Sequence, residues 1–206
     1  MIGAAELEGF KNSNLQAVLV TMFFFNLFNN MDHGALPAAL NNVQDDLGFK
    51  EVEMGSLGSY VFLGLVIGSA FATCIFGTFS YKLIVSISFI GNGIGMYLFI
   101  WFRKYYVLSF ARFCCGFCQI YLQIYIPLVI DTYCNLTQKA LWLPFVVISS
   151  PLGQCLGYTI SGVLITYGHS WRLGFFMIGT AMLISAIILW IIPNKYINLE
   201  IIMGLK

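Results

Sequence analysis

The chain alternates long apolar runs with short polar segments. Each run holds about 20 residues or more, which is the length an α-helix needs to cross the hydrocarbon core of a bilayer. The runs are continuously apolar, whereas the strands of a membrane barrel would alternate in polarity. We therefore predict an all-α membrane protein with six transmembrane helices, at residues 17–40, 54–76, 83–102, 107–130, 141–166 and 172–192. Residues 1–16 are predicted to form a polar N-terminal tail, without the features of a cleaved signal, and residues 193–206 a C-terminal tail or linker.

Composition excludes most other classes of protein. Apolar residues make up 59% of the chain and charged residues 9%, against roughly 25% charged in soluble domains. The net charge of +1 offers no basic surface for nucleic acid. Because no phosphate-binding glycine loop, paired carboxylate site or nucleophile elbow is present, we expect neither an enzyme nor a cofactor. The Cys114-Cys115-x-x-Cys118 cluster has no His, Asp or Glu beside it on its helix, so we expect packing rather than a metal site.

Loop charges indicate the orientation only weakly. With both termini inside, the inner segments hold five Lys or Arg residues and the outer loops hold four. A glycan on the sequon Asn135-Leu136-Thr137 would invert that arrangement. The pattern leaves the plasma, lysosomal and mitochondrial inner membranes open.

Two charged residues interrupt the apolar runs. Asp32 lies in the first predicted span and Arg112 in the fourth. A charge at the membrane centre costs about 2.5 to 3.5 kcal/mol, so each needs a partner or a wet cavity. At 1.5 Å per residue they lie about 12 and 8 Å from the same predicted membrane face, so they can pair. The pair either exchanges a proton or serves only to lock two helices together; His33 could share the proton or simply pack.

Polar residues on three spans fall at the spacing of single helix faces. In the fourth span Arg112, Gly116, Gln119, Gln123 and Pro127 form one stripe. Lipid cannot satisfy such side chains, so they face protein or water. They either bond helices together in a closed bundle or line a substrate cavity, for which the candidates are Asn26, Asn29, Asn30, Gln119, Gln123, Ser150 and Gln154.

Glycine spacing indicates an internal repeat. Two sets of three helices each open with a helix that carries one charge and a later proline, followed by a helix rich in small residues. Small residues four apart allow helices to approach closely in lipid. We predict a three-plus-three repeat of the kind found in transporter halves, with helix-packing glycines at Gly64, Gly68, Gly116, Gly153 and Gly157.

In the order and spacing of several motifs the sequence resembles the N-terminal half of a major facilitator superfamily transporter, Spinster-like branch. The motifs are Asn30-Met31-Asp32-His33 with Leu36-Pro37, Gly55-Ser56-Leu57-Gly58-Ser59 through Gly64, Arg112-x-x-x-Gly116, Ser150-Pro151-Leu152-Gly153 through Gly157-Tyr158, and Trp171-Arg172. The resemblance implies proton coupling by Asp32 and Arg112, and lysolipids, sphingoid lipids or other amphiphilic organic anions as substrates.

Two departures from the family pattern stand out. Where the family carries a Gly-x-x-x-Asp-Arg loop that latches the two halves, this chain reads Gly77-Thr78-Phe79-Ser80-Tyr81-Lys82, with Tyr81 in the acidic position. The chain also ends after six spans, where the family has twelve. We therefore expect either half of a secondary transporter or a degenerate accessory subunit of a larger membrane complex. The transporter needs a second six-helix half, which is another chain, a second copy or the missing C-terminal part of a longer carrier.

Overall fold

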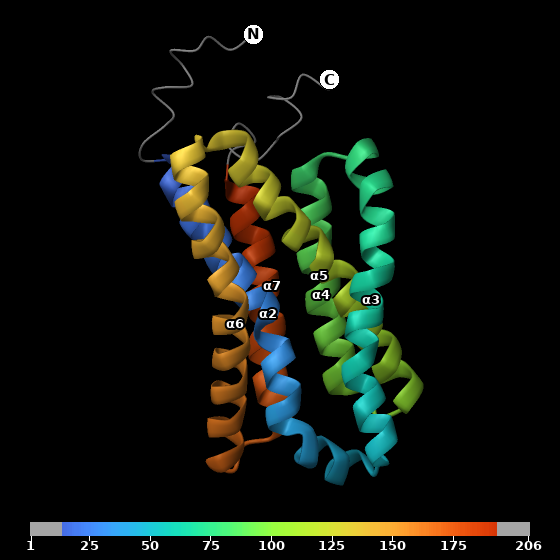
Figure 1. Cartoon of the computed structure of the whole chain (residues 1–206). Helices are drawn as coiled ribbons and strands as arrows, with labels where there is room; N and C mark the ends of the chain where they lie inside the picture. The colour runs from blue at the N-terminus through green and yellow to red at the C-terminus, as the bar shows by residue number, and fades with distance from the viewer. Residues whose placement is uncertain (1–13, 193–206) are drawn as a thin grey trace.

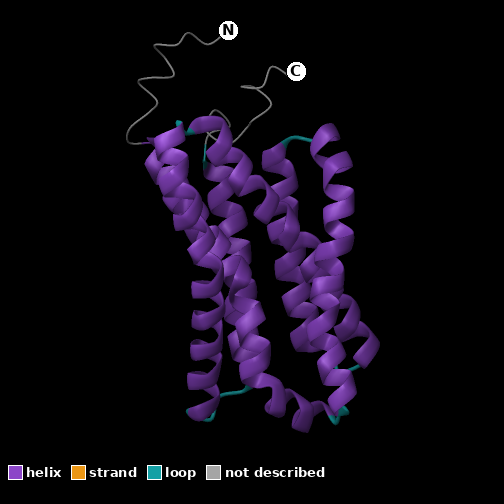
Figure 2. Ribbon diagram, viewed as in Figure 1, coloured by secondary structure: helices purple, strands orange, loops and turns teal. Residues whose placement is uncertain are grey.

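The described part of the chain, residues 14–192 of a computed structural model, is entirely helical (Figure 2). Its six helices confirm the predicted fold class, and they are α2 (Asn14–Leu47), α3 (Glu51–Thr78), α4 (Tyr81–Trp101), α5 (Tyr105–Tyr133), α6 (Leu136–Thr166) and α7 (Trp171–Ile191). Most boundaries lie within a few residues of the predicted ones. The exception is α2, which runs on from the predicted end at residue 40 to Leu47, so that Asp45 and Asp46 belong to a helix and not to a loop.

Local signals explain where the helices begin and end. Gly48 and Gly168, with φ of 70° and 82°, adopt the left-handed conformation that ends α2 and α6. The Glu53 carboxylate accepts a hydrogen bond from the Lys50 backbone N–H at 2.8 Å, which closes a capping box at the start of α3. The connections are consequently short, and consecutive helices run in opposite directions.

Five of the helices, α3 to α7, are long and apolar enough to cross a membrane. The exception is again α2, whose middle carries three asparagines, an aspartate and a histidine. It is nevertheless one of the interior helices, because Asn26, Asn29, Asn30 and Asp32 are all buried in the bundle. Polarity inside α2 therefore marks a helix that faces protein, as the cost of polar groups in lipid requires.

The helices form two groups of three (Figure 1). α2 packs along α6 and also against α7, while α5 packs along α3 and α4. Each group thus joins the first helix of one sequence triple to the second and third helices of the other triple. Contacts between α4 and α7 hold the two groups together, and α2 and α5 touch each other much less.

Glycines set the closest approaches between helices, and they do so in the same way in both groups. A side chain on Gly157 of α6 would overlap the Met31 carbonyl oxygen of α2, and one on Gly64 of α3 would overlap the Phe113 carbonyl oxygen of α5. The structure places the other predicted packing glycines, Gly68, Gly116 and Gly153, at similar contacts with the backbone of the facing helix. Backbones at this distance pack tightly without a hydrophobic driving force.

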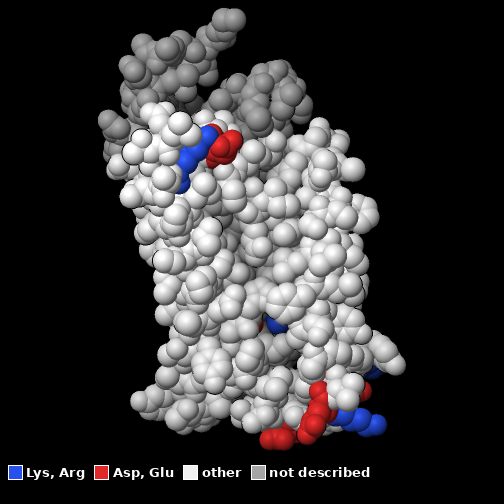
Figure 3. Space-filling model, in the orientation of Figure 1, with Lys and Arg blue, Asp and Glu red and all other residues white. Residues whose placement is uncertain are grey.

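Charges gather at the two ends of the molecule, with an uncharged band between them apart from one small recessed spot on the face shown in Figure 3. At the end opposite the start of α2, Asp46 binds Arg103 at 2.8 Å and Arg172 at 2.7 Å, and it accepts a hydrogen bond from the Trp171 indole at 3.1 Å. Burial raises the pKa of Asp46, but this hydrogen bond and the two arginines outweigh it, so the pKa lies below its ordinary value of 3.8. This Asp46 clasp ties the end of α2 to the α4–α5 loop and to the start of α7.

Candidate functional site: a buried ion pair beside a polar cavity

The two intramembrane charges meet in the interior. Arg112 Nη1 on α5 lies 3.3 Å from Asp32 Oδ2 on α2, and each residue is only 1% exposed. The pair connects the two three-helix groups through α2 and α5, two helices that make few contacts with each other along their length. Its two charges are therefore removed from water and depend on each other.

Further side chains complete the surroundings of the pair. Gln119, two turns along α5, donates its amide to Asp32 Oδ1 at 2.9 Å, and His33 Nε2 lies 3.9 Å from the same oxygen. The Arg112 guanidinium lies over the Phe99 ring of α4, 5.4 Å from its centroid, in a cation–π contact. Both carboxylate oxygens of Asp32 are thus engaged, while Arg112 Nε has no hydrogen-bond partner in the described part of the chain.

A line of amides extends from this site into α4. Asn92 donates to Asn29 Oδ1 at 3.3 Å, and Asn29 donates to the backbone oxygen of Gln119 at 3.4 Å. Within residues 14–192, the side-chain oxygens of Asn92 and Gln119 are buried without a donor. Sequence reasoning missed Asn92, although it is the single amide residue of the predicted span 83–102 and so carried a signal.

A second polar cluster joins α2 to α6. Asn26 Nδ2 donates to Ser149 Oγ at 2.8 Å and to Ser150 Oγ at 3.1 Å. Asn30 in turn donates to Asn26 Oδ1 at 3.1 Å. These bonds satisfy the Asn26 amide and fix its orientation.

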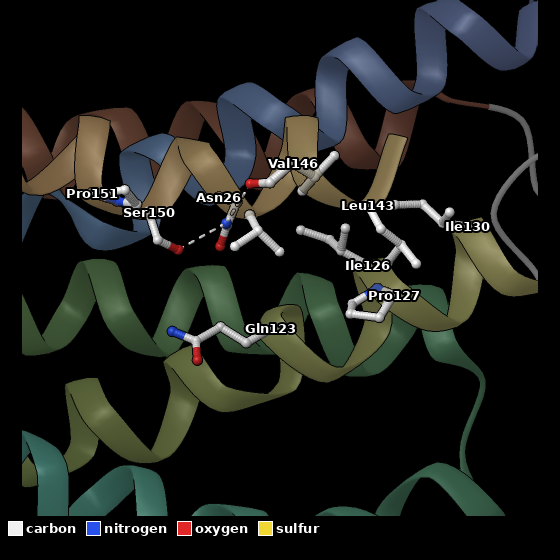
Figure 4. Close-up of a pocket in the computed structure, with 10 residues that line it drawn as sticks. Asn26, Gln123, Ile126, Pro127, Ile130, Leu143, Val146, Ser150 and Pro151 are labelled. Carbon is white, nitrogen blue, oxygen red and sulfur yellow. Dashed lines mark hydrogen bonds between the residues drawn. The ribbon is translucent and has the colours of Figure 1, made fainter. Parts of the chain in front are cut away.

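A cavity of about 270 Å³ opens beside this cluster, between α2, α5 and α6. Figure 4 shows side chains of all three helices converging on it, with Gln123 and Ser150 on opposite walls. The polar side chains in its lining are those of Asn26, Gln123 and Ser150, and the other lining residues are apolar: Ile126, Pro127, Ile130, Leu143, Val146, Val147 and Pro151. A mostly apolar cavity with a few convergent polar groups is the usual form of a small-molecule site.

The remaining predicted cavity residues lie elsewhere. Asn29, Asn30 and Gln119 are buried among the helices, where they hydrogen-bond to other residues, and Gln154 is exposed on α6 beyond the cavity. Part of the polar set thus joins helices and part lines a cavity, and a substrate in that cavity stays a prediction. Spacing along one helix cannot separate the two, because the rotation of each helix against its neighbours decides which groups meet.

The unusual segment between α3 and α4 is built into the bundle. Tyr81, in the position that is acidic in the family pattern, is buried and stacks on Phe76 with ring centroids 5.1 Å apart. The Lys82 ammonium donates to the backbone oxygens of Trp190 and Ile192 at 3.0 and 2.7 Å, which caps the end of α7.

Six packed helices, five of them of membrane-spanning character, around a buried ion pair define an integral, multi-pass membrane protein of transporter type. The model of the Major Facilitator Superfamily matches residues 22–200, and the chain belongs to that superfamily of transporters. A search of curated proteins finds no match.

Among solved structures the chain is similar to a bacterial homologue of the human lysosomal transporter Spinster. The inward-facing, unoccupied form matches with a TM-score of 0.75 at 15% identity, over 87% of this chain. The inward-facing, occupied form matches with a TM-score of 0.67 at 14% identity, over 85% of this chain. Both matches cover 43% of the other chain, so this chain spans less than half the length of the structures it matches. The predicted resemblance to a major facilitator superfamily transporter is confirmed by the family model, and the fold is similar to that of a Spinster homologue.

Proposed function

We propose that the chain is half of a secondary active transporter for a small organic or amphiphilic solute, that Asp32 and Arg112 couple it to protons, and that it works against a second six-helix half. The observation that carries the proposal is the buried Asp32–Arg112 pair, which links the two three-helix groups. If the ion pair only held helices together, apolar side chains of similar size could replace it without loss of stability.

The pair can act as a proton-controlled link. A proton on Asp32 removes the negative charge that faces Arg112 and leaves the guanidinium buried without a counter-ion. Arg112 must then move toward water or toward another acid. Because few other contacts join α2 to α5, loss of this bond weakens the link between the two groups on this side, while α4 and α7 still hold them together. In this mechanism Gln119 is a positioning residue that holds the second oxygen of Asp32, with His33 beside it.

Uneven burial supports the need for a second half. In the most apolar 18-residue segments of α3 and α6, 22% of the residues are buried within the bundle, whereas the corresponding segments of α4, α5 and α7 are 44 to 61% buried. The two least buried helices therefore offer surfaces for a partner bundle. Alternating access requires two bundles around one site.

The test is proton uptake into vesicles of the native membrane, followed with a pH-sensitive dye after an imposed pH gradient. We expect Asp32→Asn to abolish the uptake that depends on this chain, because it removes the titrating group and keeps the side-chain size. Asp131→Asn is the control, since Asp131 is exposed and pairs with Lys139 at the end of α5. Unchanged uptake in Asp32→Asn would reject proton coupling.

A second candidate function is that of an accessory subunit in a larger membrane complex. The observation that favours it is Lys82, whose ammonium caps α7 instead of facing a second half. Isolation of the complex from its native membrane separates the two candidates. A carrier is expected to yield one further six-helix half, and an accessory subunit a set of unrelated subunits with no proton uptake lost in Asp32→Asn.

A further inference from the structure

The cavity between α2, α5 and α6 carries no charge of its own. None of its ten lining residues is Lys, Arg, His, Asp or Glu. Arg112 is not in the lining, and its guanidinium is held by Asp32. An anionic head group placed here would lose its hydration without gaining a counter-ion, which is strongly unfavourable in a low-dielectric site.

The polar groups that remain available in the cavity suit hydroxyl or amide chemistry. Asn26 is already satisfied by Ser149, Ser150 and Asn30. The Gln123 side chain, by contrast, makes no hydrogen bond within the described part of the chain, and it projects into the cavity. Ser150 accepts one bond from Asn26 and makes no other there, so its O–H is free to donate to a ligand.

Two prolines add backbone acceptors on facing helices. Proline has no N–H, so Pro127 cannot bond the carbonyl of Gln123 four residues before it, and Pro151 cannot bond that of Val147. All four of these residues line the cavity. Two carbonyls that have lost their usual helical donor thus belong to residues that line the same cavity. The partial negative charge of such a carbonyl oxygen repels anions and attracts O–H and N–H groups.

We propose that this cavity binds the uncharged, hydroxyl- or amide-bearing head group of an amphiphile and discriminates against the phosphate or carboxylate of an organic anion. The inference rests on the proposed function, since it names the substrate class of the same site. Ser150 O–H and the Gln123 amide bind the head group, together with the two carbonyls. The apolar lining, Ile126 and Leu143 among it, receives the first carbons of the chain. A volume of 270 Å³ corresponds to about nine water molecules, enough for a head group of glycerol size.

Two probes with the same acyl chain test the proposal: monooleoylglycerol, which is neutral, and its phosphate ester, oleoyl-lysophosphatidic acid. Binding to the purified full chain in detergent is measured by thermophoresis. We expect monooleoylglycerol to bind at least about tenfold more tightly than the phosphate ester, since burying an uncompensated charge costs more than the 1.4 kcal/mol that equals a factor of ten. Ser150→Ala and Gln123→Leu should each weaken monooleoylglycerol binding by about fivefold, the usual weight of one hydrogen bond.

Matched controls repeat each substitution away from the cavity. Ser185→Ala removes a buried hydroxyl on α7 that donates to the Ala181 carbonyl oxygen, and Gln44→Leu removes a half-buried amide near the far end of α2. Both should leave binding unchanged. Tighter or equal binding of the phosphate ester, no binding of monooleoylglycerol, or equal losses in the variants and their controls would overturn the proposal. This assay involves no proton movement, so its failure is distinct from a failure of the proton-uptake test. If only the proton-uptake test failed, a binding site of the stated chemistry would still be in place.

Discussion

Asp32 and Arg112 pair with each other in a buried site, so removing one of them costs more stability than removing both. Arg112→Met should destabilise the chain by about 3 kcal/mol or more, because Asp32 is left buried with Gln119 and His33 alone. The double variant Asp32→Leu/Arg112→Met removes both charges and should regain most of that loss. Thermal unfolding in detergent provides the comparison; equal melting temperatures of the single and double variants would show that the charges do not depend on each other.

At Asp46 the expected effect depends on pH. The folded chain lowers the pKa of this carboxyl group below 3.8, so ionised Asp46 favours the folded state. That stabilisation is complete above the ordinary value and disappears as the pH falls through the lowered one. The melting temperature of the wild type should therefore exceed that of Asp46→Asn by a constant margin from neutral pH down to about pH 5, and the margin should shrink below about pH 4. A margin that grows on acidification would contradict the clasp.

The depth of the two charges could be read from the sequence, and the pairing of Asp32 with Arg112 follows from the cost of isolated charges in lipid. Helix rotation could not be read in this way. Gln119 was expected to line a cavity, yet it donates to Asp32, because α5 turns that position toward α2. Gln154 lies only four residues after Ser150 but outside the cavity. Hydrogen bonds between helices determine where these side chains lie, and the spacing of residues along a single helix does not reveal such bonds.

At the scale of the helix pair, α2 and α6 approach so closely that one added methyl group disrupts their packing. Gly157→Ala places a Cβ on the Met31 carbonyl oxygen, and neither backbone can move without displacing its whole helix. We expect a fall in melting temperature of several degrees. Gly162→Ala, five residues further along α6, meets nothing within 4 Å and should leave the melting temperature unchanged or raise it slightly. Equal effects of the two substitutions would exclude close packing as the role of Gly157.

Helix number and helix ends were largely predictable, because apolar runs of membrane length are read directly from composition. The far end of α2 was not, since hydropathy reports where a helix leaves the hydrocarbon and not where its hydrogen bonds stop. From residue 41 to Leu47 the helix is polar, and the Asp46 clasp stabilises its last turn. A sequence pattern of charges alone could not show that Asp46 meets Arg103 and Arg172, which are far along the chain.

At the scale of the whole molecule, the low burial of α3 and α6 leads to a prediction about what lies next to them in the membrane. Phe62 of α3 stacks on His33 beside the ion pair, and the backbone of Tyr158 on α6 lies close to Gly34 of α2, yet both side chains are exposed. If a second half covers this side, a photoreactive p-benzoylphenylalanine at position 62 or 158 should form a protein cross-link of one defined mass in the native membrane. Phe176 on α7 is similarly exposed on a helix assigned no partner and serves as the matched position, where adducts with lipid are expected.

The mass of the cross-linked product then identifies the partner. A product of twice 23.1 kDa indicates a second copy of the chain, and one other defined mass indicates a separate half. Several different masses from the same position indicate the crowded surroundings of an accessory subunit. Adducts with lipid alone from positions 62 and 158 would mean that α3 and α6 face the bilayer, and the two-bundle mechanism would then fail, because Asp32 and Arg112 would have no opposing half across which access could alternate.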